Sequence, residues 1–258
     1  MKKLRLFCLA LMMLVPTTSH AQIAGFNFLD GWTLQQSDSG LPPAVGEDFI
    51  DITNGGSQQR NIWFNTPQNI DAFTASFRYQ ATDTPFNPEG GISFIIHANA
   101  SGLDTSSSGA FGFAGIDSSV GITIELDNNG PKTSTGVFSN GVIGTGSTDI
   151  SSFSPLDGFD VSIDYDGRLL TLGIENGVNT PFERTTIISP DFATILNSNN
   201  AIVGFGASNS NIAGSSNFTQ TISNFRFSSS SAIPEPSPAL ILAGLSCVAG
   251  LSWRRRRQ

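Results

Sequence analysis

Glu125 and Asp127 are the side chains whose type and spacing best suit chemistry in this chain. Alternate residues of an extended strand point to the same side, so the two carboxylates share one face. Carboxylate oxygens are ligands that hard cations prefer. The pair is equally compatible with half-buried strand carboxylates that accept hydrogen bonds from backbone amides or pair with an arginine.

Histidine and cysteine are too scarce for nucleophilic catalysis. The chain has two of each, and His20, Cys8 and Cys247 lie in terminal segments that resemble targeting signals. The remaining His97 cannot assemble Ser-His-Asp or Cys-His chemistry. Beside an apolar strand it is predicted to be structural.

The segments that must position Glu125 and Asp127 are predicted to be strands. Several stretches alternate apolar and polar side chains with a period of two, which is typical of half-buried strands; they are 73–79, 161–165 and 170–174. Asp166-Gly167 predicts a hairpin between the last two, because glycine tolerates a positive φ.

Other strands are predicted to be covered on both faces. Residues 92–96 and 121–126 are more continuously apolar than the alternating stretches. No stretch of helix length carries apolar residues at every third or fourth position. We therefore predict an all-β sandwich forming one domain over residues 22–227, with Trp32 and Trp63 in its core.

Both ends of the chain are predicted to be targeting segments. Residues 1–21 combine early basic residues, an apolar run and small residues at a cleavage position, which is typical of a secretory signal peptide. Residues 228–238 form a Ser/Pro-rich linker, and 239–258 an apolar run followed by four arginines. That run has about 15 residues where a permanent span needs about 20, so it favours transient membrane association.

The charge distribution excludes nucleic acid as a partner. Of 13 basic residues seven lie in the two terminal segments, whereas 21 acidic residues include only Glu235 in the tail. Such an acidic domain repels a phosphate backbone. Its surface suits a neutral partner or a bound cation, and it is equally compatible with simple solubility outside the cell.

The C-terminal segment resembles the PEP-CTERM sorting signal of bacteria, which combines the Pro234-Glu235-Pro236 triplet, the apolar run and the arginines. The resemblance implies export and transient insertion in the inner membrane. It further implies delivery to the cell surface or extracellular matrix of a bacterium that makes exopolysaccharide.

The order of strand-like segments resembles the legume-type (L-type) lectin domain, a concanavalin A-like jelly roll of two large antiparallel sheets. The motifs that carry the likeness run in the family's order over about 200 residues. They include 31–34, 62–67, 90–96, 109–113, 120–127 and 203–208. The likeness implies a non-enzymatic carbohydrate-binding protein whose partner is a glycan or exopolysaccharide.

The same resemblance implies a metal site that includes calcium, with Glu125 and Asp127 as carboxylate ligands and Asn128 or Asn129 as amide ligands. The chain departs from the family here, because the loop after Asp127 is short. The family's later Asn, Asp and His are absent.

The sugar site implied by the resemblance is also altered. The family's sugar-binding Asp falls at Gly90, with Glu89 just before it as a replacement acceptor. Gly109 matches the glycine whose backbone N–H donates to the sugar, although an ordinary turn glycine fits that position too. The side-chain amide of Asn129 could also form hydrogen bonds with sugar hydroxyl groups.

Two other functions are compatible with this fold. A matrix or surface structural protein would keep the lectin-like scaffold with a degenerate sugar site. A glycoside hydrolase would need paired carboxylates, and relatives of that kind carry Glu-x-Asp-x-x-Glu where this chain has Gly130. The missing carboxylate argues against hydrolysis.

Overall fold

The computed structural model describes residues 22–36, 41–56, 58–82, 90–98, 110–127, 132–144, 146–209 and 218–229. The predicted signal peptide, most of the linker and the apolar C-terminal segment lie outside these residues. Within them, no helix combines the length and the apolar character that a membrane span requires. Residues 20–230 form one compact unit that contains both sheets.

The described chain is built almost entirely from strands. In order the elements are β1 (Gln22–Ala24), η1 (Asn27–Leu29), β2 (Trp32–Gln36), β3 (Phe49–Asn54), β4 (Gln59–Phe64), β5 (Gln68–Asn69), β6 (Phe73–Thr82), β7 (Gly90–His97), η3 (Ala110–Gly112), β8 (Ser119–Asp127), β9 (Lys132–Ser139), β10 (Thr148–Asp149), β11 (Phe159–Tyr165), β12 (Leu169–Glu175), β13 (Phe182–Ile187), α1 (Phe192–Leu196), β14 (Asn200–Asn209) and β15 (Thr219–Ser229).

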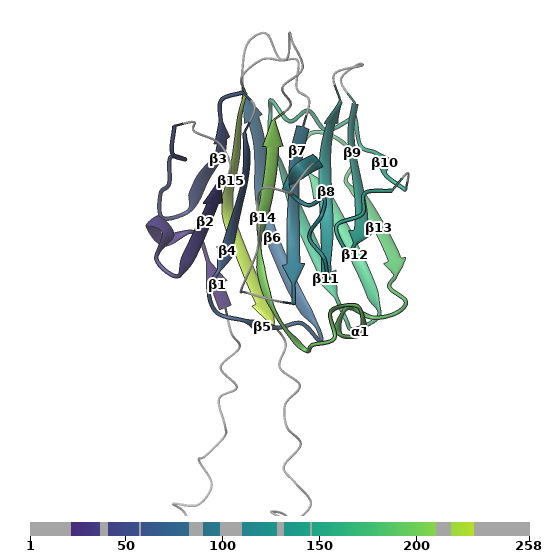
Figure 1. The fold of residues 1–258 in the computed structure, drawn as a ribbon. Helices are drawn as coiled ribbons and strands as arrows, with labels where there is room; N and C mark the ends of the chain where they lie inside the picture. The colour runs from purple at the N-terminus through teal and green to yellow at the C-terminus, as the bar shows by residue number, and fades with distance from the viewer. Residues whose placement is uncertain are drawn as a thin grey trace, which may run out of the picture. The chain divides into compact units, whose positions relative to one another are not determined.

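Two antiparallel sheets lie face to face (Figure 1). A seven-stranded sheet has the order β1-β15-β6-β11-β12-β13, with β3 also paired to β15. An eight-stranded sheet has the order β10-β9-β8-β7-β14-β4-β2, with β5 also paired to β14. The predicted sandwich of two large antiparallel sheets is confirmed.

The alternation in the sequence becomes alternation in burial. Every second side chain of β11 is buried from Phe159 to Tyr165, and the residues between them are exposed. The predicted hairpin follows, with Asp166 Oδ1 accepting hydrogen bonds from the backbone N–H groups of Arg168 at 2.9 Å and Leu169 at 2.7 Å. The continuously apolar β7 is buried along its whole length, as predicted.

An aromatic cluster fills the space between the sheets. Phe205 of β14 packs against Phe94 of the same sheet and against Phe77 and Phe225 of the opposite one, with ring centroids 5.0–5.5 Å apart. Trp32 joins this core through Phe225 at 5.9 Å. Edge-to-face packing of these rings across both sheets fixes the spacing of the sheets.

A second, smaller cluster covers the outer face of the eight-stranded sheet. Its members are Trp63, Ile95, Phe113, Ile116, Phe138 and Ile202. Residues 110–118 supply two of them, so this segment lies over the sheet and buries it from outside. Trp63 is therefore core as predicted, although in this second layer. His97 is 7% exposed and its ring lies 6.1 Å from that of Trp63.

Both tyrosines of the chain lie in the sandwich and resist ionisation. Burial raises the pKa of Tyr79 far above its usual value. Burial is also the main cause of the raised pKa of Tyr165, which the backbone N–H of Phe192 partly offsets.

Alkaline pH is therefore expected to destabilise the domain. An unfolded chain releases tyrosine protons from about pH 10, whereas the folded chain retains that of Tyr79, so rising pH favours unfolding. The free energy of unfolding should be insensitive to these groups below about pH 10 and should fall above it by up to about 1.4 kcal/mol per pH unit for Tyr79. Near-ultraviolet absorbance should show tyrosinate appearing together with loss of circular dichroism. Tyrosinate formed in a still-folded domain would contradict this account.

Candidate functional site

The strand ends that carry the predicted site residues meet at one edge of the sandwich. Gly90, the first residue of β7, pairs with Leu126 of β8 on one side and with Asn209, the last residue of β14, on the other. Asp127 pairs with Lys132 where β8 gives way to β9. These ends lie at the upper edge in Figure 1. The topology thus brings residues distant in sequence to one place.

Glu125 lies on the outer face of the eight-stranded sheet near this edge. It is half-buried, and its neighbours Ile124 and Leu126 point into the main core. Its Oε1 accepts a hydrogen bond from Thr123 at 3.3 Å and its Oε2 accepts one from Ser134 at 3.1 Å. Both of these partners are neutral hydroxyls.

Gly90 is held in a conformation that excludes a side chain. Its φ is +143°, and a Cβ there would lie 2.1 Å from the carbonyl oxygen of Ser208. A carboxylate at this position would require the backbone of β7 or β14 to move. An acidic group that binds a ligand beside position 90 must therefore belong to another residue.

Residues 110–112 form a strap that is hydrogen-bonded to the middle of the sheet. The Phe111 N–H donates to Ser208 Oγ at 2.8 Å, and Ser93 Oγ donates to the Phe111 carbonyl at 3.0 Å. Asn61 Nδ2 donates to the Gly112 carbonyl at 2.7 Å. Gly112 has a φ of +68°, and a Cβ there would lie 2.4 Å from the Ala207 nitrogen, so only glycine permits this contact.

The three side chains that fix this strap were not singled out in the sequence. Asn61, Ser93 and Ser208 are buried polar residues inside strands. The sequence did contain one signal for the strap. Ser93 interrupts the apolar run 92–96, and a buried hydroxyl needs a hydrogen-bond partner. The strap fixes the chain two residues after Gly109.

A buried hydrogen-bond network lies beneath the same edge and joins the two sheets. Gln220 of β15 accepts from the Tyr79 hydroxyl at 2.9 Å and donates to Thr53 Oγ1 at 3.1 Å. It also donates to Asn209 Oδ1 and to the Ser208 carbonyl. Asn209 in turn donates to the carbonyls of Gly55 and Phe218. These hydrogen bonds therefore fix the position of the end of β14, which lies beside Gly90.

The predicted site residues divide into those the structure describes and those it does not. Glu125 and Gly90 are described, and Asp127 is described as the last residue of β8 but without its side chain. Glu89, Gly109, Asn128 and Asn129 lie outside the described residues. Across the described part of the chain, no three histidine, cysteine, aspartate or glutamate side chains gather as a metal site would require. The donor chemistry of Glu125 suits calcium, which takes six to eight oxygen ligands. The described side chains alone do not reach that number.

Comparisons with known proteins bear on both parts of the chain. Residues 232–257 match the PEP-CTERM protein-sorting motif, as predicted. A search of curated protein sequences found no match.

Solved structures similar to this chain are legume lectins. The acidic lectin of winged bean, solved with methyl-α-D-galactose, has a TM-score of 0.65 at 16% identity, over 82% of this chain and 98% of the lectin. Peanut lectin has a TM-score of 0.65 at 20% identity, over 82% and 97%. Arcelin-5, a lectin-like defence protein of Phaseolus vulgaris, has a TM-score of 0.62 at 13% identity, over 82% and 98%. The predicted concanavalin A-like jelly roll is confirmed.

Proposed function

We propose that this protein is an exported, non-enzymatic carbohydrate-binding protein whose partner is a glycan or exopolysaccharide. The observation that carries the proposal is the convergence of the β7, β8 and β14 ends at one edge of a lectin fold. Glu125 and the hydrogen-bonded strap at Phe111 lie on the outer face beside it. Sugars are recognised by convergent polar groups held on a rigid support, and the network beneath this edge supplies the support.

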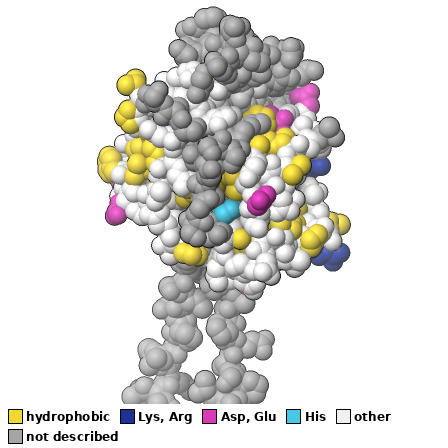
Figure 2. Space-filling model, in the orientation of Figure 1, with side chains coloured by type: hydrophobic (Ala, Val, Ile, Leu, Met, Phe, Trp, Pro, Cys, Tyr) yellow, Lys and Arg dark blue, Asp and Glu magenta, His cyan; other side chains and the backbone are white. Residues whose placement is uncertain are grey.

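The proposed location follows from the sorting motif. Export through a signal peptide, a transient stay in the inner membrane, and delivery to the cell surface or extracellular matrix would place the domain among polysaccharides. Most of the described surface visible in Figure 2 carries uncharged side chains. Such a surface suits a neutral polymer better than a charged one.

Calcium is proposed to assist binding through Glu125, Asp127, Asn128 and Asn129. Glu125 and Asp127 occupy alternate positions of β8, and residues at alternate positions of an extended strand share one face. When bound, the ion would supply positive charge that fixes amide and carboxylate oxygens beside the sugar. The hydroxyls of Thr123 and Ser134 orient the Glu125 carboxylate.

A scaffold role is the second candidate, and Gly90 favours it. The position that the lectin resemblance assigns to an acidic sugar ligand excludes any side chain. A matrix or surface structural protein would keep the sandwich and lose this ligand.

Calcium titration into the metal-stripped fragment 22–230, with a glycan array run with and without chelator, separates these candidates. We expect saturable calcium uptake and glycan signals that chelator removes. Asp127→Asn and Glu125→Gln should each weaken calcium binding by about tenfold or more, because each removes a charged oxygen ligand. Asp157→Asn, an exposed carboxylate on another segment, is the matched control and should bind as the unaltered fragment does.

Absence of both calcium uptake and glycan signals would reject the lectin site and leave the scaffold. Calcium-free glycan binding that survives Asp127→Asn would reject calcium assistance at this edge.

A further inference from the structure

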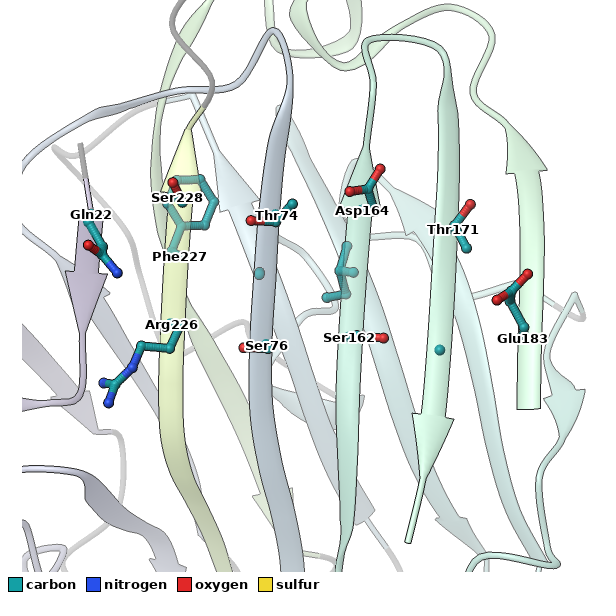
Figure 3. Close-up of a pocket in the computed structure, with 13 residues that line it drawn as sticks. Gln22, Thr74, Ser76, Ser162, Asp164, Thr171, Glu183, Arg226, Phe227 and Ser228 are labelled. Atoms are coloured by element: carbon teal, nitrogen blue, oxygen red, sulfur yellow. The ribbon is translucent and has the colours of Figure 1, made fainter. Parts of the chain in front are cut away.

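The outer face of the seven-stranded sheet is hollowed across its strands (Figure 3). The register aligns Ser76 of β6, Ser162 of β11 and Gly173 of β12 in one row. The two serines have short side chains and the glycine has none, so the surface of the sheet is depressed along this row. We call the resulting depression, of about 350 Å³, the transverse trough.

Gly173 determines the depth of the transverse trough. A Cβ at this position would lie 2.5 Å from Ser162 Oγ, so even alanine would displace the serine and raise the floor. Solvent faces of sheets usually carry longer side chains, and a row of Ser, Ser and Gly on neighbouring strands is what opens this one.

Polar side chains form the walls of the trough. On one side the adjacent row contains Thr74, Asp164 and Thr171, which the register places on β6, β11 and β12. On the other side, two residues from Ser76 and Ser162 and outside the lining, Arg78 and Asp160 form a salt bridge at 3.3 Å. These walls are fixed by the sheet, since neighbouring strands are tied by backbone hydrogen bonds along their length.

The two ends of the trough carry side chains of opposite charge, and Arg226 at one end also forms an ion pair with Asp48 at 3.7 Å. Arg226 of β15 pairs with Ser76, and Glu183 of β13 pairs with Gly173, so they close the same row. Four strand spacings separate them, or about 19 Å at about 4.8 Å each. The trough is therefore long enough for an extended chain.

Two hydroxyls and two carboxylates of the trough are open to a ligand, whereas Thr171 and Arg226 already have partners. No hydrogen bond within the described part of the chain engages the hydroxyls of Ser76 and Ser162 or the carboxylates of Asp164 and Glu183. The apolar residues that contribute to the lining, Ala75, Ile163 and Phe227, are buried in the core. A hydrophobic protein partner would find no aromatic anchor here, because the lining contains no tryptophan or tyrosine and its Phe227 is buried.

We propose that the transverse trough binds an extended, uncharged polysaccharide chain that crosses the strands. Hydroxyls and carboxylates on the floor and walls match the hydroxyl groups along such a polymer, and Arg226 donates at one end. The two carboxylates disfavour an acidic polymer. This site is on the sheet opposite the β7–β8 edge and needs no metal, so it stands independently of the lectin site. With both sites occupied, one domain would connect two polymer chains.

Affinity electrophoresis of fragment 22–230 tests the proposal. Gels would contain dextran, laminarin, xylan or galactomannan as neutral polymers, and alginate as an acidic one, all with chelator present. We expect at least one neutral polymer to retard the fragment. Ser162→Arg, which places a long side chain on the floor, should weaken this binding by about tenfold. Thr74→Arg on the wall is a second variant with the same expected result.

Ser151→Arg is the matched control, because Ser151 is exposed and follows β10 at the edge of the other sheet. It should be retarded as strongly as the unaltered fragment. The chelator in every gel removes calcium from the proposed lectin site, which separates the two sites. Failure of every neutral polymer to bind, unaltered binding by a folded Ser162→Arg or Thr74→Arg variant, or binding of alginate alone would overturn the proposal. Self-association that Ser162→Arg abolishes would instead assign the trough to a second copy of this chain.

Discussion

Replacing Phe205 by alanine is expected to lower the free energy of unfolding by about 3–5 kcal/mol. Phe205 is fully buried, and its ring lies 5.0 Å from that of Phe225 and 5.1 Å from that of Phe77, both on the opposite sheet. Phe94 and Phe26 complete its surroundings. Removal of the ring leaves a cavity between rigid sheets that cannot collapse around it.

Chemical denaturation of fragment 22–230 would measure this loss. Phe28→Ala is the matched control, because Phe28 is 69% exposed. Surface substitutions of this kind usually change stability by less than about 0.5 kcal/mol. Equal losses for Phe205→Ala and Phe28→Ala would show that the cluster does not hold the sheets together.

Replacing Gln220 by leucine is expected to lower the free energy of unfolding by about 3 kcal/mol or more. Leucine nearly preserves the volume but removes both the acceptor for Tyr79 and the donors for Thr53 and Asn209. These partners stay buried, and each buried polar group that loses its hydrogen bond costs about 1–3 kcal/mol.

The companion variant Tyr79→Phe removes one hydroxyl and leaves a single unsatisfied acceptor at Gln220. It should cost about 1–2 kcal/mol, clearly less than Gln220→Leu. Denaturant titration gives the two stabilities, and hydrogen exchange at the end of β14 shows whether the opening is local. A leucine variant as stable as the parent would mean that the network contributes nothing net.

Much of the fold was predictable because period-two patterns dictate which face of a strand is buried. The stretches 73–79, 161–165 and 170–174 all form strands of one sheet, and Asp166-Gly167 forms their hairpin. The legume-lectin order of motifs then gave the topology. Pattern reasoning missed the second apolar layer, because Trp63, Phe113 and Phe138 are separated in sequence and meet only through the segment 110–118.

The candidate site was predictable only in part, for a physical reason. Alternation on β8 places Glu125 and Asp127 on one face from sequence alone. The exclusion of a side chain at Gly90 depends instead on how closely the carbonyl of Ser208 approaches, which is a property of the packed sheet. Likewise the transverse trough forms because the register between strands aligns Ser76, Ser162 and Gly173 in one row. No local sequence pattern specifies that register.

The position of β15 determines how the domain would bear a mechanical load. If the protein is held at its sorting motif, tension enters the sandwich at Ser229, the last residue of β15. That strand pairs with β1, β3 and β6, and Ser228 lies directly opposite Gln22. Pulling on the C-terminal end therefore shears a long strand bonded to neighbours on both sides, so many hydrogen bonds must break together rather than one at a time. A strand held in this way resists detachment more strongly than one at the edge of a sheet.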